Sequence, residues 1–125
     1  MMREPSAVDP GAWIAAVGHV LAGSAAQPVL AATGIDRVTL LAVARAEASG
    51  VGADGVTRLS HAQLAEAVGV PRAAVLRARL ALIELGLEHL AAAPGAPGTV
   101  DRVLRHPSTW PAASGELDLV PRGKV

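Results

Sequence analysis

The sequence contains no cysteine, and this absence excludes a disulfide scaffold, a thiolate metal site and a cysteine nucleophile. Phenylalanine and tyrosine are also absent, and two tryptophans account for the whole aromatic content of 2%. Because proteins that bind single-stranded nucleic acid stack bases on aromatic rings, this class of function is disfavoured. Basic and acidic side chains balance at 11 each, which disfavours a general polyanion-binding protein.

Long apolar runs are absent as well. No segment reaches the roughly 18 to 20 continuous apolar residues that a membrane span requires. The most apolar stretch, residues 12–32, is interrupted by polar residues and a proline. It does not resemble a signal peptide, because Glu4 and Asp9 precede it and Arg3 is the only cation there. We therefore expect a cytoplasmic protein without a membrane partner.

What the chain does contain is small apolar side chains. Hydrophobic residues make up 51% of its 125 residues, and with so few aromatics the core must be built from alanine, valine and leucine. Such side chains let helices pack closely, so a mainly helical single domain is expected. Arginine outnumbers lysine, whose single copy is Lys124, in a chain rich in alanine, glycine and proline. This composition is typical of a GC-rich bacterial genome.

The first part of the chain predicts three helices. Asp9 and Pro10 are typical of a helix start, and this helix should run to residue 21. A shorter helix is expected over residues 27–33, and a third from Thr33 or Asp36 to about residue 49. In the third helix we expect the apolar residues to face the core and the charged ones to face outward: Val38, Leu40, Leu41, Val43 and Ala44 against Arg37, Arg45 and Glu47.

The central part predicts a strand followed by two helices. Residues 56–59 are β-branched enough for a short strand, and Ser60 with Gln63 forms the capping box of a helix over residues 62–68. That helix ends at Gly69. A new helix begins at Pro71 and runs to residue 85, where Gly86 suits a left-handed cap. Two strands, 87–92 and 99–105, then form a small β-hairpin around a turn of proline and glycine, so the expected fold is mainly α with one hairpin.

Residues 60–87 carry the pattern of two helices crossing at a tight turn. The positions that carry it are Leu64 and Ala65 in the first helix, Gly69 and Val70 at the turn, and Val75, Ala78 and Leu82 in the second helix. This segment resembles the helix-turn-helix of bacterial winged-helix proteins, such as the GntR-like and MarR-like regulators. The resemblance extends weakly over residues 35–105. It implies a winged helix-turn-helix domain over residues 35–106, with residues 1–34 as an additional N-terminal helical extension.

In this family the second helix enters the DNA major groove and the wing lies along the backbone or minor groove. The resemblance therefore implies sequence-specific binding of double-stranded DNA by a homodimer, in transcription regulation or in replication or partition control. The resemblance leaves open whether a small-molecule effector binds. Carried over by position, the candidate DNA-binding residues lie in the second helix, at the start of the first helix and on the strands: Pro71, Arg72, Ala73, Leu76 and Arg77; Ser60 and His61; Arg58, Arg102 and Arg105.

Two departures from the family pattern support an alternative function. Leu76, Leu80 and Ile83 form a second apolar strip where DNA-reading helices usually carry polar side chains, and the turn at residues 93–98 has no charge. The strip is either covered by the N-terminal helices or exposed as a contact surface. The alternative is therefore a winged-helix module for protein–protein interaction or dimerisation without strong DNA binding.

No pattern in the chain predicts an enzyme, a cofactor or a metal site. Residues 50–55 have the spelling of a dinucleotide-binding motif, but they follow a helix and precede a strand, so we interpret them as a connector. The four histidines are scattered. Ser60 and His61 are neighbours whose side chains diverge on a helix, so they are not a nucleophile and its base. Glu84 and Glu88 are interpreted as a solvated helix edge rather than an acid–base pair.

The two tryptophans and the C-terminal segment need separate interpretations. Trp13 is expected to anchor the first helix in the core, whereas Trp110 either folds back onto the body or marks a contact. Residues 107–115 are expected to be a tail. Residues 116–125 contain a segment that resembles a thrombin cleavage sequence, 119–123, and are interpreted as a cloning remnant outside the fold.

Overall fold

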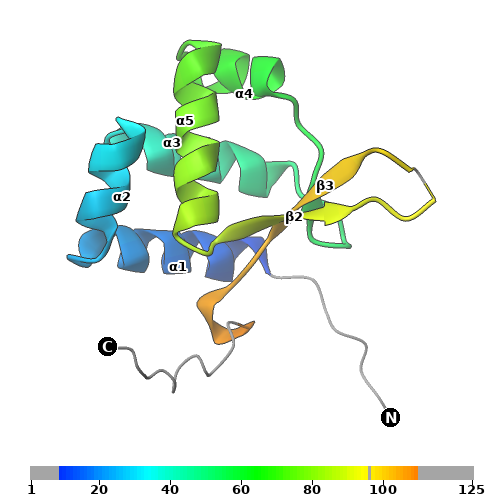
Figure 1. The fold of residues 1–125 in the computed structure, drawn as a ribbon, viewed down its shortest axis with the longest axis horizontal. Helices are drawn as coiled ribbons and strands as arrows, with labels where there is room; N and C mark the ends of the chain where they lie inside the picture. The colour runs from blue at the N-terminus through cyan, green and yellow to red at the C-terminus, as the bar shows by residue number, and fades with distance from the viewer. Residues whose placement is uncertain (1–8, 96, 110–125) are drawn as a thin grey trace.

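The computed structural model describes residues 9–95 and 97–109, and Figure 1 shows their arrangement. Within these residues the protein is mainly helical, with five α-helices and a three-stranded antiparallel sheet. The elements follow one another as α1 (Pro10–Ala22), α2 (Ala26–Thr33), α3 (Arg37–Ser49), β1 (Val56–Thr57), α4 (His61–Val68), α5 (Arg72–Glu84), β2 (Glu88–Ala92), β3 (Val100–Leu104) and the 3-10 helix η1 (Pro107–Thr109).

Side-chain caps explain where three of the helices begin. The Asp9 carboxylate accepts a hydrogen bond from the Ala12 amide at 2.8 Å, and Asp36 accepts one from the Thr39 amide at 3.0 Å. Ser60 forms the predicted capping box with Gln63 at the start of α4. These bonds satisfy backbone donors that have no partner inside the helix. The predicted starts of α1, α3 and α4 are thereby confirmed to within a residue or two.

The predicted β-hairpin is part of a larger sheet. Its strands are ordered β1-β3-β2, so β3 lies in the middle and pairs with both neighbours in antiparallel fashion. The register places Thr57 of β1 and Leu90 of β2 on either side of Arg102 in β3. Because directly paired residues point to the same face of a sheet, these three side chains share the face that also carries Glu88.

Helix α1 belongs to the same hydrophobic core as the rest of the described chain. Trp13 is fully buried together with Val17, and both pack with α3 and α5 residues in one cluster. The indole nitrogen of Trp13 donates a hydrogen bond of 2.8 Å to the carbonyl oxygen of Leu87, next to the start of β2. Figure 1 shows α1 beneath α3 and α5, beginning on the side of the sheet and running away from it toward α2. The expectation that Trp13 anchors the first helix is confirmed.

Three expectations about exposure are wrong. Glu47, expected on the outside of α3, is fully buried, whereas Val38, expected in the core, is 78% exposed. The reason is that α1, α4 and α5 all pack on α3. The buried surface of α3 is therefore wider than a single apolar stripe and includes residues near its C-terminal end. Glu88, expected on a solvated helix edge near Glu84, is 1% exposed because it lies in β2 and points into the core.

Among the described residues, no single helix is long and apolar enough to cross a membrane. Helices α1 and α2 reach that length and composition only when they are taken together, and they are bent by 90° at the break between them. Their buried side chains, including Leu21 and Leu30, pack into the core. The expectations for Trp110 and for the segment 116–125 lie outside the described residues, as does most of the tail expected over residues 107–115.

Candidate functional site

One face of α5, with the cap before it, presents half of the predicted DNA-binding residues to solvent. The opposite face, which includes Val75 and Ala78, is buried in the core. Since side chains three and four positions apart share a helix face, the exposed residues form a continuous surface along the helix, and the helix cap before them is exposed too. This surface, which we call the α5 face, consists of Pro71, Arg72, Ala73, Leu76, Arg77 and Leu80.

The two arginines of the α5 face are exposed and unpaired, whereas Arg58 and Arg102 each pair with a carboxylate. Neither Arg72 nor Arg77 forms an ion pair or a side-chain hydrogen bond with any residue that the structure describes. The stem of Arg77 passes beside Gly34, where an added Cβ would lie 3.8 Å from its Cδ. Both guanidinium groups therefore keep their donors available for a ligand.

Leu76 and Leu80 lie between and beyond these arginines, and each is 49% exposed. The N-terminal helices do not cover them: the buried residues of α2 are Ala26, Leu30 and Thr33, and these contribute to the interior instead. The expectation that α1 and α2 hide the apolar strip is therefore wrong for these two leucines, while Ile83 is half-buried. The α5 face thus alternates cationic and apolar groups.

Behind the α5 face, Arg79 is the centre of a buried polar network. Its Nε forms a short charged hydrogen bond with the Glu47 carboxylate of α3. Its Nη2 donates to the carbonyl oxygen of Leu59 at 2.8 Å, and its Nη1 lies 3.0 Å from Nδ1 of His61. Because a guanidinium has donors only, His61 Nδ1 must accept, which places the imidazole proton on Nε2. Arg79 therefore holds α3, α4 and the segment after β1 together.

Glu88 extends this network into the sheet. Its Oε1 accepts a hydrogen bond of 2.8 Å from Nη1 of Arg102, whose side chain remains partly exposed. Burial, followed by the hydrogen bond and charge of Glu47, raises the pKa of Glu88 to about 9, although Arg102 acts in the opposite direction. The carboxyl group of Glu88 is therefore neutral at pH 7. As a result, the positive charge of Arg102 is not cancelled by its hydrogen-bond partner.

The pKa of His61 is affected by several cations around the start of α4. Its pKa is lowered first by burial and then by the positive charges of Arg79, Arg102 and Arg72. These three arginines come from the middle of α5, from β3 and from the first position of α5. The negative charge of Glu47 acts on the pKa of His61 in the opposite direction, so the three arginines outweigh it at this imidazole.

The remaining predicted residues are less available for a ligand. Arg58 is exposed but pairs with Asp54, with 2.7 Å between Nη2 and Oδ2. The hydroxyl and the amide of Ser60 are both used in the capping box. Arg105 is half-buried at the end of β3 and influences His89 rather than His61. The structure thus brings Arg72, His61 and Arg102 together, while Arg58 and Ser60 already have partners within the protein.

Arg79 is not among the predicted site residues and its partner Glu47 was expected at the surface, although both have a recognisable signal in the sequence. Arg79 lies four residues after Val75 and three before Leu82, which is the spacing of the buried stripe of α5. Glu47 continues the buried stripe of α3 in the same way. A charged residue at a position where helical spacing predicts an apolar one indicates a buried pair, provided that a second helix offers the opposite charge.

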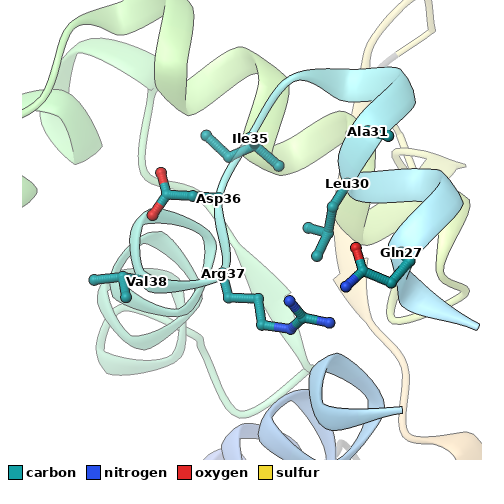
Figure 2. Close-up of a pocket in the computed structure, with 7 residues that line it drawn as sticks. All are labelled: Gln27, Leu30, Ala31, Ile35, Asp36, Arg37 and Val38. Atoms are coloured by element: carbon teal, nitrogen blue, oxygen red, sulfur yellow. The ribbon is translucent and has the colours of Figure 1, made fainter. Parts of the chain in front are cut away.

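The described surface includes a hollow at α2 and another beside the sheet. The first, of about 340 Å³, lies between α2 and the start of α3 and has Leu30 and Ile35 on its walls (Figure 2). Its charged groups already have structural tasks, since Asp36 caps α3 and Nε of Arg37 donates to the Leu21 carbonyl oxygen at 2.6 Å. The second, of about 290 Å³, lies beside the sheet and is lined by Thr57, Arg58, Leu59, Arg79, Val100, Asp101 and Arg102.

Within the described ranges, no group of three or more histidine and acidic side chains is placed to hold a metal ion. The arrangement that remains is a helix face with two unpaired arginines, next to the arginines around His61 at the start of α4. Comparisons of the chain with protein-family models, with curated proteins and with solved structures find no match.

Proposed function

We propose that this protein is a winged helix-turn-helix protein that binds a specific sequence of double-stranded DNA, with α5 as the recognition helix. The observation that carries the proposal is the pair of unpaired arginines, Arg72 and Arg77, on the exposed face of α5. The element order from α3 to β3 supports it, since a helix, a strand, two helices and two further strands are what the resemblance implies. The left-handed Gly69 between α4 and α5 supports it as well.

Each group on the α5 face has a counterpart in the major groove. A guanidinium donates two parallel hydrogen bonds to O6 and N7 of a guanine, which makes Arg72 and Arg77 the sequence-reading side chains. Ala73 and Leu76 are apolar groups at the same depth, and apolar side chains contact the methyl group of thymine. The mixture of cationic and apolar groups is therefore compatible with reading a site that contains both guanine and thymine.

The arginines around His61 supply the contacts that orient the helix. Arg102 lies in the middle of β3, and its charge is not cancelled by the neutral Glu88. A phosphate near the start of α4 would meet this charge together with Arg72. We propose that the protein binds as a cytoplasmic homodimer on a two-fold site, in transcription regulation or in replication or partition control.

Selection from a random duplex library tests this proposal. The enriched site is titrated at two salt concentrations with the wild type and with Arg72→Ala, Arg77→Ala and Arg45→Ala. Each of the first two changes should cost about 1–3 kcal/mol of binding free energy if it removes a bidentate base contact. Arg45 is exposed on α3 outside the α5 face, so its change controls for the loss of one charge. Unchanged affinity in both test variants, or no enriched site, contradicts the proposal.

The exposure of Leu76 and Leu80 favours a second candidate, a protein–protein interaction or dimerisation module without strong DNA binding. Under this alternative, Leu76→Glu abolishes self-association, measured by sedimentation equilibrium. Leu90 in β2 is similarly exposed, at 48%, and Leu90→Glu is the matched control. A wild-type chain that stays monomeric, or that responds equally to both changes, contradicts this alternative.

A further inference from the structure

The hollow beside the sheet brings together three guanidinium groups from separate parts of the chain. Arg58 follows β1, Arg79 comes from α5 and Arg102 from β3, while Asp101 is the one carboxylate among the lining residues. Its volume of about 290 Å³ exceeds what a single water molecule occupies. The lining is therefore cationic and large enough for an anionic group.

A buried hydroxyl at this hollow has no partner. Thr57 is one of the lining residues, is 3% exposed, and its Oγ1 makes no hydrogen bond with the residues that the structure describes. Buried hydroxyl groups are nearly always hydrogen-bonded, because leaving one unpaired costs the free energy of its desolvation. The register places Thr57 directly beside Arg102. A ligand that accepts hydrogen bonds would satisfy both side chains once the atoms that close Oγ1 of Thr57 off from solvent move aside.

The charges of the three arginines are not compensated equally. Arg79 is paired with Glu47 inside the core, and each of its three side-chain nitrogens already has a hydrogen-bond partner. Arg58 pairs with Asp54 at the surface, where both side chains are more than half exposed and the pair is readily exchanged. Arg102 makes one hydrogen bond, through Nη1, to the buried Glu88. The donors of Arg102 and Arg58 are therefore the ones that a ligand can use.

We infer that the hollow between β1 and β3 binds a phosphate group, held by the guanidinium groups of Arg102 and Arg58 and by the hydroxyl of Thr57. Phosphate fits this donor set because its oxygens accept several charged hydrogen bonds together with one from a hydroxyl. The group belongs either to a DNA backbone or to a free phosphorylated small molecule. The site does not depend on the α5 face, so it stands whether or not α5 reads a DNA sequence.

Titration of the ¹⁵N-labelled full chain with inorganic phosphate tests the inference, with chloride at the same ionic strength as the reference. The amides of Thr57 and Arg102 should shift with phosphate and not with chloride. Arg102→Gln and Thr57→Val should each weaken phosphate binding about tenfold or more, which is the usual effect of removing a hydrogen bond to a charged group. Arg45→Gln removes an exposed cation elsewhere and should leave the affinity unchanged.

Thr57→Val also separates a binding role from a structural one. Valine keeps the shape of threonine and removes the unpaired hydroxyl, so the free variant should melt at the same or a higher temperature than the wild type. Loss of phosphate binding in a variant that is not destabilised supports the site. Shifts that chloride reproduces, or phosphate affinity that both Arg102→Gln and Thr57→Val retain, overturn the inference.

A second set of titrations identifies the source of the phosphate. If DNA binding is found, competition by inorganic phosphate at constant ionic strength, together with weaker DNA binding by Arg102→Gln, assigns the group to the DNA backbone. DNA affinity that Arg102→Gln leaves intact, with phosphate binding lost, assigns it to a free phosphorylated molecule. If no DNA binds while phosphate still shifts Thr57, the site stands and the proposed function fails.

Discussion

Glu47, Arg79 and Glu88 place three ionisable side chains in a core that is otherwise built from small apolar residues. Removing charges from water is costly, and a buried pair is tolerated only when its geometry and hydrogen bonds are good. Here the cost is lowered in two ways: Arg79 uses all three of its nitrogens, and Glu88 takes up a proton instead of carrying a charge. The network joins α3, α4, α5 and β2, so it fixes the position of the α5 face relative to the sheet.

The protonation of Glu88 makes stability depend on pH. Its pKa is raised from 4.5 to about 9 in the folded protein, so folding takes up a proton throughout that interval. A group with a raised folded pKa contributes most below its unfolded pKa, and that contribution is lost as the pH rises toward the folded pKa. Glutamine does not titrate, so the Glu88→Gln variant lacks this pH dependence. Its free energy of unfolding should therefore exceed that of the wild type increasingly from pH 5 to pH 9, by up to about 1.4 kcal/mol per pH unit.

Urea unfolding of both proteins at several pH values measures this difference. Burial lowers the pKa values of His61 and His89, so these histidines also change stability with pH, but their contributions are shared by both proteins and cancel in the difference. Glu84→Gln, at an exposed position of α5, is the control and should show no pH-dependent gain. A constant difference between Glu88→Gln and the wild type across the range would mean that Glu88 is not protonated in the folded state.

At the scale of the elements, the turn between α4 and α5 depends on a single left-handed residue. Gly69 has a φ of +83°, and an added Cβ there meets nothing within 4 Å. Gly69→Ala should therefore destabilise the protein by backbone strain alone, about 1–2 kcal/mol. Gly18 lies inside α1 with equally open space around it. Gly18→Ala should instead stabilise the protein, by about 0.5–1 kcal/mol, because alanine favours the helix.

Urea unfolding of the two variants side by side checks both signs with the same substitution. Equal effects of the two changes would contradict the left-handed conformation at the turn. Since Gly69 sets the angle between α4 and α5, Gly69→Ala should also lower DNA affinity more than its loss of stability explains, if the proposed function holds.

The elements themselves were largely predictable, because their signals are local. Asp9, Asp36 and Ser60 cap helices through bonds to residues three positions away, and the chain needs no tertiary information for these. The two hairpin strands were predicted to within one residue, and so was the start of α5 after Pro71, whereas β1 ends two residues earlier than predicted. These are the features that propensity and capping chemistry decide.

The burial of charged residues was not predictable in the same way. Glu47 is buried because α5 packs on α3 and presents Arg79, which lies 32 positions away in the sequence. Glu88 follows the helix by a few residues, and only the strand alternation of β2 turns it inward. The candidate site was therefore predictable only in part. The α5 face follows from helical spacing, whereas the network behind it and the hollow at Thr57 depend on the tertiary arrangement.

At the scale of the whole molecule, α1 is joined to the far end of the fold through Trp13. Its side chain is fully buried and donates a hydrogen bond to Leu87, beside the first residue of the sheet's hairpin. Trp13→Ala should cost about 3–5 kcal/mol of unfolding free energy, through the cavity and the lost bond. Trp13→Phe keeps much of the volume and should cost clearly less. Urea unfolding measures both, and a loss below about 1 kcal/mol for alanine would show that α1 is not part of the cooperative unit.

The bond between Trp13 and Leu87 also has a consequence for the order of events during synthesis. The two residues are 74 positions apart. At a translation rate of roughly 5 to 20 residues per second, about 4 to 15 seconds pass between their additions to the chain. Throughout that time the indole of Trp13 lacks the carbonyl group that accepts its hydrogen bond. Helix α1 can pack on α3 earlier, because α3 is made before the hairpin. The last bond that fixes the N-terminal helix therefore forms only after residue 87 has left the ribosome.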